Sequence, residues 1–163
     1  MKILRPQPLT REAFAPFGDV IALEGARRFA INGGSTQRFH DLARVDTAAG
    51  GGRTLINLFR ASARPRPLQL DLMERHPLGS QAFIPLAPLP FVVVVAGDEN
   101  DQVGALRAFL SSGWQGVNYS RNVWHHPLLA LHDDADFIVI DRGGEGCNLQ
   151  ECLLTEAVAV LLD

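Results

Sequence analysis

Short strand-like segments recur along almost the whole chain, and turn residues separate them. Several of these segments alternate polar and apolar residues. The full set lies at residues 19–23, 38–45, 53–60, 68–74, 81–86, 91–95, 128–132 and 137–141. Turn residues rich in glycine, proline or asparagine lie between them, at residues 49–52, 64–67, 97–100 and 143–146. Many short strands with little helical periodicity predict an all-β fold, mainly β with short helices, built as a β-sandwich or β-barrel.

One short helix is predicted near the start of the chain. Thr10 is a good N-cap for a helix over residues 11–14, because its hydroxyl can accept a hydrogen bond from a free backbone N–H, and Gly18 ends the helical stretch. The chain has 163 residues, enough for one domain with a substantial core. No linker, repeat or low-complexity stretch divides it, so a single domain over residues 1–163 is expected.

The run from Phe91 to Val95 is apolar at every position. Strands whose two faces are both apolar are buried on both sides. This run therefore predicts a central strand whose outer face is covered by a second sheet layer or by a partner subunit.

Composition excludes several classes of partner. The net charge is -3 and the arginines are scattered, so the chain has no basic footprint for nucleic acid. No apolar run has the length of a membrane span or a signal peptide, and a soluble cytoplasmic protein is expected. Cys147 and Cys152 lack the usual spacing of a zinc site and do not make a disulfide framework, so inert thiols are expected.

The segment from Gly116 to Pro127 holds the densest group of polar and aromatic side chains: Tyr119, Arg121, Asn122, Trp124, His125 and His126. Pro127 excludes a helix and favours extended geometry for the residue before it. Successive side chains of an extended segment point to opposite faces. We therefore expect only one of the two histidines to face a ligand inside a barrel.

A second polar cluster surrounds the turn at residues 77–79. His76 and Gln81 flank this turn, so both can reach one mouth of a barrel. Three imidazoles, or two with a carboxylate, could hold a divalent metal. The adjacent pair at 125 and 126 cannot easily place both rings on one ion, and a hydrogen-bonded structural role is the alternative for each histidine. Further along, Asp141 and Arg142 are expected to form a surface ion pair.

Three long motifs, residues 74–85, 116–127 and 140–144, closely resemble the ureidoglycolate lyase family. The same order and spacing extend to residues 14–21, 40–43 and 91–95, so the resemblance spans almost the whole chain. The family often has histidine where this chain has Ser120, and no catalytic role is expected at that position.

The resemblance implies a cupin-like β-barrel, or double-stranded β-helix, that is a homodimer. It implies a carbon–nitrogen lyase of the amidine-lyase type, which splits (S)-ureidoglycolate into glyoxylate and urea in allantoin breakdown. A small-molecule substrate follows from this activity. Two alternatives stay open: an amidohydrolase that releases ammonia, and a cupin-like module that binds small carboxylates without turnover.

The resemblance, with the chemistry of the substrate, assigns roles within the two clusters. His125 is expected to be the base or a metal ligand, His76 a second ligand or the acid, and Tyr119 a further catalytic residue. A divalent ion, Ni²⁺ or similar, would be held by His76, Gln81 and His125.

Substrate binding is expected from the remaining polar residues of the clusters. Arg75 or Arg121 would pair with the substrate carboxylate, because guanidinium groups bind carboxylates with two parallel hydrogen bonds. Gln81 and Asn122 would orient the ureido group, and His126 completes the expected binding set.

Overall fold

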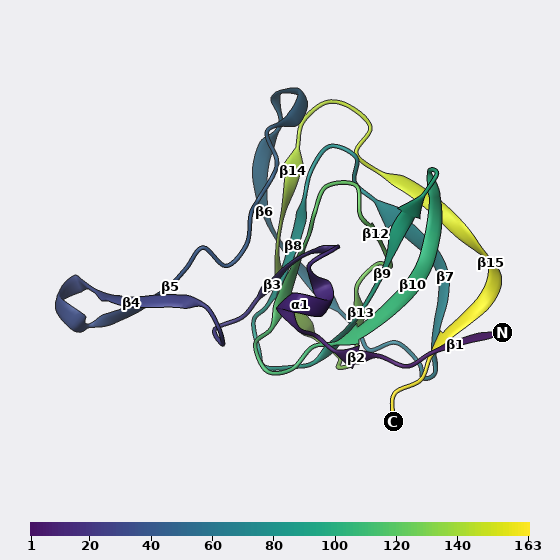
Figure 1. Cartoon of the computed structure of the whole chain (residues 1–163), viewed down its shortest axis with the longest axis horizontal. Helices are drawn as coiled ribbons and strands as arrows, with labels where there is room; N and C mark the ends of the chain where they lie inside the picture. Colours follow the sequence, from purple (N-terminus) through teal and green to yellow (C-terminus); the bar gives the residue numbers. More distant parts are fainter.

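Two curved sheets form the body of the computed structural model, which describes residues 1–163 (Figure 1). The larger sheet has the strand order β1-β15-β7-β12-β9-β10-β2, with β13 paired to β9. Its strands are β1 (Lys2–Leu4), β2 (Gln7–Pro8), β7 (Leu68–Arg75), β9 (Phe91–Glu99), β10 (Gln102–Leu110), β12 (Trp124–His125), β13 (Leu129–Ala130) and β15 (Gln150–Val160).

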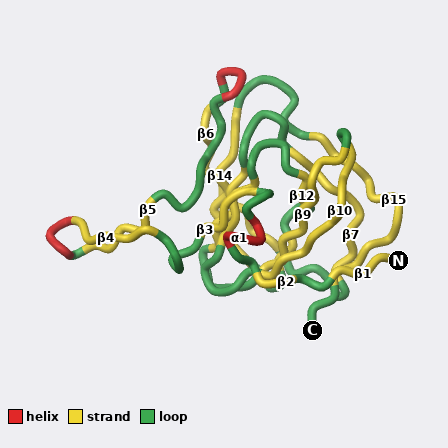
Figure 2. The backbone as a smooth tube through the Cα atoms, viewed as in Figure 1, coloured by secondary structure: helices red, strands yellow, loops and turns green.

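The smaller sheet has five strands in the order β3-β11-β8-β14-β6, all antiparallel to their neighbours. Its strands are β3 (Gly18–Ile21), β6 (Arg53–Ala61), β8 (Gln81–Pro85), β11 (Gly116–Tyr119) and β14 (Ala135–Gly143). A separate ribbon pairs β4 (Arg27–Ile31) with β5 (Thr36–His40) and projects from the body. Helical structure is confined to α1 (Arg11–Phe14) and the 3-10 turns η1 (Asn32–Gly34) and η2 (Ala49–Gly51) (Figure 2).

The predicted all-β, cupin-like fold is confirmed, and so is the helix capped by Thr10, whose Oγ1 accepts from the N–H of Ala13 at 3.2 Å. The strand predicted over residues 38–45 is wrong beyond His40, because Asp41 adopts a left-handed φ of 55° that ends the extended run. The turn predicted at residues 97–100 is also misplaced. β9 continues to Glu99, and the turn is made by Asn100 and Asp101, with φ of 53° and 67°.

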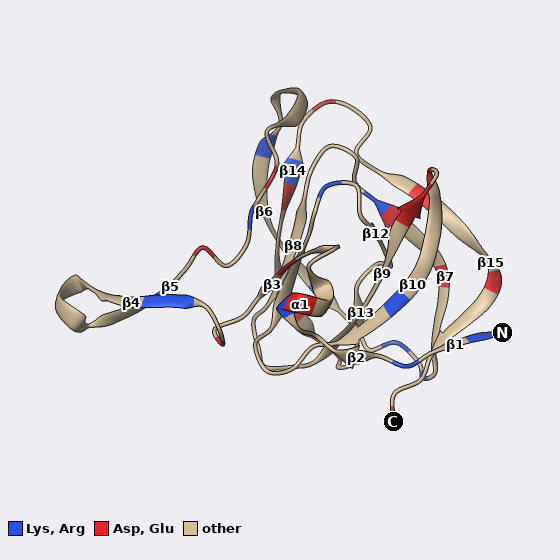
Figure 3. Cartoon of the chain, viewed as in Figure 1, with Lys and Arg blue, Asp and Glu red and all other residues tan.

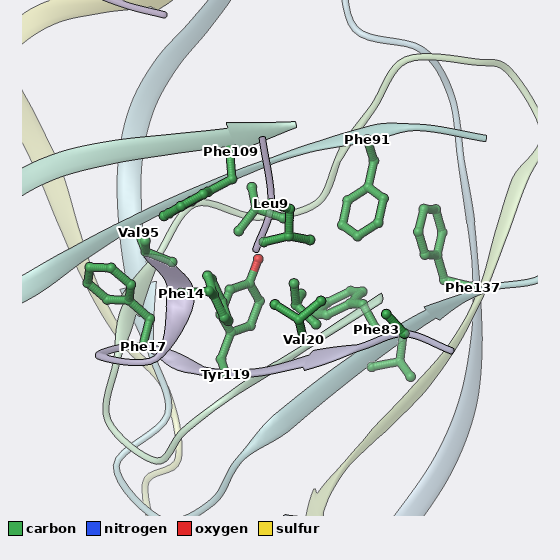
Figure 4. Packing of buried hydrophobic residues seen from close by; sticks show 14 of the residues in the cluster. Leu9, Phe14, Phe17, Val20, Phe83, Phe91, Val95, Phe109, Tyr119 and Phe137 are labelled. Atoms are coloured by element: carbon green, nitrogen blue, oxygen red, sulfur yellow. The ribbon is translucent and has the colours of Figure 1, made fainter. Parts of the chain in front are cut away.

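β9 lies between two apolar clusters, and its side chains alternate between them. Phe91, Val93 and Val95 belong to the first cluster, which fills the space between the two sheets (Figure 4). Val92 and Val94 belong to the second cluster, on the other face of the larger sheet. The prediction that residues 91–95 are covered on both sides is therefore confirmed.

The face of β9 that carries Val92 and Val94 is covered by this chain itself. β10 and β15, far apart in the strand order of the larger sheet, line one hollow of about 210 Å³. The larger sheet thus curls until these two strands approach each other, and the second cluster fills the curl. A partner subunit is not needed to bury β9.

Aromatic side chains from both sheets and from α1 close the first cluster near the candidate site. Phe14 of α1 packs edge-on against Phe109 with ring centroids 5.6 Å apart, and its ring lies 6.2 Å from that of Tyr119. Each fully buried phenylalanine contributes about 1.5–3 kcal/mol of hydrophobic stabilisation. This packing holds β11 and the larger sheet together directly beside His125.

Candidate metal and substrate site

Three metal-ligand side chains converge where β7 and β12 pair. Glu74 of β7 lies directly opposite His125 of β12, and His76 follows the end of β7. One donor atom from each residue, a carboxylate oxygen or an imidazole nitrogen, lies within 4.8 Å of the other two. Two imidazoles and one carboxylate are a common ligand set for divalent transition metals.

Each of the two imidazoles is held by a backbone carbonyl at its Nδ1. Nδ1 of His125 lies 2.9 Å from the carbonyl oxygen of Val123, and Nδ1 of His76 lies 2.8 Å from that of Asn148. A carbonyl can only accept, so each Nδ1 carries a proton, and in the neutral imidazole each Nε2 then presents a lone pair. Histidines that bind metals are usually held in this way by a second hydrogen bond.

Both Nε2 atoms point toward the carboxylate of Glu74. The distances to Glu74 Oε1 are 3.5 Å from His125 and 4.0 Å from His76. Nε2 of His125 is buried and has no hydrogen-bond partner in the protein. Ligands at about 2.0–2.2 Å from one tetrahedral ion are separated by roughly 3.4 Å, so this spacing suits a shared ion.

Gln81 adds an oxygen to the same group. Its Nε2 donates to Asp141 Oδ2 at 3.2 Å, and Asp141 Oδ1 accepts from Asn57 at 3.0 Å. A carboxylate can only accept, so Asp141 turns the oxygen of the Gln81 amide toward Nε2 of His76, 3.1 Å away. Two lone-pair donors thus face each other, an arrangement that a bound cation would stabilise. The residues present therefore fit a divalent metal.

The surroundings keep Glu74 ionised and Tyr119 protonated. Burial works against the charge of Glu74, but the close approach of the His125 imidazole, with the nearby His76, holds the pKa of its carboxyl below the ordinary value. Burial, with a further contribution from the charge of Glu74, raises the pKa of the Tyr119 hydroxyl. The Tyr119 ring stacks on the His125 ring at 4.1 Å with an interplanar angle of 9°. Tyr119 therefore fixes the plane of His125 by packing.

His126 lies on the opposite face of the strand from His125. Its Nδ1 lies 2.8 Å from the carbonyl of Pro127, and its Nε2 is 3.4 Å from Asp71 Oδ1 without making a hydrogen bond. Burial lowers the pKa of this imidazole, which favours the neutral form. Only His125 of the adjacent pair faces the Glu74 carboxylate.

Arg75 is not brought to the group around Glu74. It alternates with Glu74 on β7, so its side chain lies on the other face of the sheet, over the Trp124 ring at 4.3 Å. Its guanidinium donates to Asp98 at 2.8 Å and to Asp101 at 2.5 Å. With both carboxylates engaged, Arg75 holds the curl of the larger sheet together.

Arg121 and Asn122 lie at the rim of the site, on the turn between β11 and β12. The backbone N–H of Asn122 donates to the carbonyl of His76 at 2.9 Å, which ties this turn to the site. Arg121 makes a paired contact with Asp46, at 2.7 and 3.0 Å, on the protein surface. Ser120, beside them, is exposed.

Two residues of this site, Glu74 and Asp141, were missed by the reasoning from sequence. Glu74 and His76 are two positions apart on an extended segment, a spacing that puts both on one face and could have identified Glu74. The expected Asp141–Arg142 surface pair is wrong, because neighbours on a strand point to opposite faces. Asp141 points toward Gln81, while Arg142 is 6% exposed and donates to the backbone carbonyls of residues 49 and 145.

Comparison with known proteins adds to this geometry. The family described as Ureidoglycolate lyase matches residues 1–161. The chain belongs to the ureidoglycolate lyase family. Among its relatives in this family, the ureidoglycolate lyase of Burkholderia cepacia is 60% identical over 159 residues, which cover 97% of this chain and 90% of the relative.

Other members of the ureidoglycolate lyase family align over nearly the same length. The ureidoglycolate lyase of Burkholderia mallei is 57% identical, with 97% of this chain and 93% of the relative covered. That of Brucella anthropi is 55% identical, covering 92% and 89%. A solved dTDP sugar isomerase from Desulfovibrio desulfuricans G20 superposes with a TM-score of 0.44 at 15% identity, over 80% of this chain and 85% of that chain, and carries no functional conclusion. The protein has no helix that is both long and apolar enough to span a membrane.

Proposed function

We propose that this chain is a ureidoglycolate lyase that cleaves (S)-ureidoglycolate into glyoxylate and urea. The observation that carries the proposal is the convergence of Glu74 with the Nε2 atoms of His76 and His125, in a member of this family. The fold, the buried lone pairs and the ionised carboxylate together make a site for proton transfer on a small polar substrate.

The reaction needs a proton moved between two atoms of one substrate. Ureidoglycolate is a carbinolamine, in which a single carbon bears a hydroxyl, a carboxylate and the ureido nitrogen. Removing the hydroxyl proton lets the C–O bond become the carbonyl of glyoxylate while the C–N bond breaks. The departing nitrogen takes up a proton and leaves as urea. One proton is taken and one is returned, so no oxidant or water is consumed.

A divalent ion, nickel or similar, is proposed at this site. His76, His125 and Glu74 would hold it, with the Gln81 amide oxygen beside His76 as a further donor. When bound, such an ion supplies Lewis acidity that lowers the pKa of a hydroxyl on the substrate. This reassigns His125 from the possible role of base to that of a ligand.

Glu74 is proposed to carry the proton. Its Oε1 faces both imidazoles, which leaves Oε2 to accept the substrate hydroxyl proton and return it to the departing nitrogen. A positioned carboxylate is a suitable acceptor for such a transfer. Tyr119 is proposed to orient His125, and Asp141 to orient the Gln81 amide.

Substrate binding is assigned to Arg121 and Asn122, at the rim of the site. Arg121 is proposed to take the substrate carboxylate in exchange for Asp46, since both partners of this pair are partly exposed and such pairs are worth little. Asn122 lies beside it and would hydrogen-bond the ureido group. Arg75 and His126 are left out of this set, because their side chains lie on the other side of the larger sheet.

The location and assembly of the protein are proposed on the same basis. A cytoplasmic homodimer agrees with the resemblance of the whole chain to its family. Its partner molecules would be the small substrate and a second copy of the chain.

Product analysis tests the activity. Purified protein is expected to release urea and glyoxylate in equal amounts, well above the spontaneous rate. Ammonia without urea would favour the amidohydrolase, and binding of glyoxylate without turnover would favour a binding module. Elemental analysis and chelation test the ion: removing it should abolish turnover, and adding back one divalent metal should restore it.

A further inference from the structure

Residues 27–40, here called the arm, form a ribbon that stands away from the body (Figures 1 and 2). Its strands β4 and β5 pair with each other and belong to neither main sheet. None of these residues is buried. An isolated two-stranded hairpin is at best marginally stable in water, so a ribbon in this position needs a surface to lie on.

The charged residues of the arm are all basic (Figure 3), whereas the rest of the chain has a net negative charge. The arm contains Arg27, Arg28 and Arg38 and no acidic residue. The guanidinium groups of Arg27 and Arg38 lie 5.4 and 5.9 Å from the centre of the Phe29 ring, so the cations are grouped around one aromatic side chain. Of 15 Lys and Arg in the chain, 12 lie outside the arm together with all 18 Asp and Glu. The surface that suits the arm is therefore acidic, like the body of this chain.

The smaller sheet has an apolar surface on the face turned away from the first cluster. Five aliphatic residues, here called the outer patch, lie side by side in the strand register of β6, β14 and β8: Ile56, Leu58, Ile138, Ile140 and Ile84. Ile56 is 75% exposed and Leu58 53% exposed. An outer sheet face that meets only water is normally polar, and contiguous exposed apolar surface marks an interaction site.

The arm and the outer patch lie toward the same side of the molecule. Figure 1 shows the arm leaving the body on the side of the smaller sheet, away from the larger sheet. The outer patch covers the face of the smaller sheet that is turned away from the larger one. A partner molecule that binds to the outer patch would thus lie within reach of the arm.

We propose that the outer patch and the arm form one two-fold symmetric interface with a second copy of this chain. The two patches pack against each other, and each arm lies on the body of the opposite copy, whose net charge is negative. A two-fold interface uses the same surface on both copies, and a self-complementary apolar patch satisfies this condition. Stable interfaces bury about 800 Å² from each partner. The five partly exposed aliphatic side chains of the outer patch are too few to bury this area alone, and the arms supply the rest. The inference deepens the homodimer proposed above by naming its contact surface.

Sedimentation of the full chain and three variants tests the interface. The patch variant carries Ile56→Asp and Leu58→Asp, and the arm variant carries Arg27→Glu, Arg28→Glu and Arg38→Glu. Leu153→Asp is the matched control, because Leu153 is 74% exposed and lies on β15 in the other sheet. The wild type and the control are expected to sediment as dimers. Both other variants should raise the dimer dissociation constant at least tenfold.

Hydrogen exchange on the wild-type chain gives a second measurement that needs no variant to fold. The backbone amides of the arm should be protected in the dimer and lose this protection on dilution. The joint interface would be overturned if the wild type were monomeric, or if the arm were unprotected. It would also be overturned if the dimer dissociation constant rose in only one of the two variants or in neither. Ureidoglycolate cleavage is measured on the same samples. A monomer with full turnover overturns the interface alone, and a dimer without turnover overturns the proposed function alone.

Discussion

Nε2 of His125 lies 3.5 Å from Oε1 of Glu74, and the side chain of His125 is almost fully enclosed. The pair is created by strand register, since Glu74 and His125 are opposite each other where β7 meets β12. His125 Nε2 has no hydrogen-bond partner in the protein, and the oxygen of Glu74 that faces it is placed to share a cation with it. Activity and metal binding should therefore depend strongly on this carboxylate.

Replacing Glu74 by glutamine tests this dependence. Glu74→Gln keeps the size of the side chain but removes the charge and the proton acceptor. The turnover of ureidoglycolate should fall by about 10²-fold or more, as for the loss of a positioned acid–base group. The bound metal, measured by elemental analysis of the purified protein, should fall with it.

Glu151→Gln is the matched control for this substitution. Glu151 is the cross-strand neighbour of Glu74 on β15 and is exposed. Its loss should leave both the metal content and the turnover unchanged. Equal losses in the two variants would show that the general charge of the strands, and not the position of Glu74, supports activity.

The adjacent histidines should separate into one active and one structural residue. His125→Ala removes a donor of the site and should abolish turnover in protein that remains folded. His126→Ala empties a buried position on the opposite face and should lower the free energy of unfolding by about 1–3 kcal/mol, with turnover per folded molecule retained. Chemical denaturation and assays of the soluble fraction distinguish the two. Full activity in His125→Ala would contradict the proposed site.

The parts of the fold that follow local patterns were predictable from sequence. The first half of β7 alternates polar and apolar residues, and β9 is apolar on both faces, so their periods indicate strands directly. β10 and β15 were not predicted, and both contain register shifts, between Val103 and Leu106 and between Leu153 and Val158. Such irregularities break the alternation on which the prediction of a strand depends.

The site was predictable only in part, because much of it depends on pairing between distant strands. His76 and Gln81 flank one turn, so their proximity follows from the local sequence. The pairing of Glu74 with His125 depends on the register of β7 and β12, which no local pattern specifies. The two carboxylates that engage Arg75 were also beyond local patterns, because Asp98 and Asp101 reach it from the distant end of β9 and from the β9–β10 turn.

Asp141 should act as a positioning residue. Asp141→Asn replaces an obligate acceptor by an amide that can also donate, so the Gln81 amide is free to turn its nitrogen toward His76. The affinity for the metal should fall about 10- to 100-fold, as for other residues that orient ligands. Metal titration followed by spectroscopy or calorimetry gives this readout independently of turnover.

Asp136→Asn is the comparison for this variant. Asp136 lies on the same strand, but its carboxylate pairs with Arg60 on the surface. This variant should bind metal as the wild type does. If Asp141→Asn also kept its metal affinity, Gln81 would not need to be oriented by Asp141.

Asp98 should make part of the stability depend on pH. Burial disfavours its charge, but hydrogen bonds from Trp124 Nε1 and the N–H of Asp101, with the charge of Arg75, hold its pKa below the ordinary value of 3.8. A carboxyl with a lower pKa in the folded state stabilises the protein fully above its ordinary value. This stabilisation is lost as the pH falls through the lower, folded-state pKa. Asp98→Asn should therefore destabilise the protein at pH 7 and make progressively less difference below about pH 4.

Tryptophan fluorescence provides the measurement of this pH dependence. Trp124 is buried and donates to Asp98 at 3.2 Å, whereas the only other tryptophan, Trp114, is exposed. A Trp114→Phe background thus reports unfolding from Trp124 alone. In this background, denaturant titrations should show that Asp98→Asn lowers the free energy of unfolding less at about pH 3 than at pH 7. A difference that stays constant between these pH values would show that the variant acts through packing and not through the charge of Asp98.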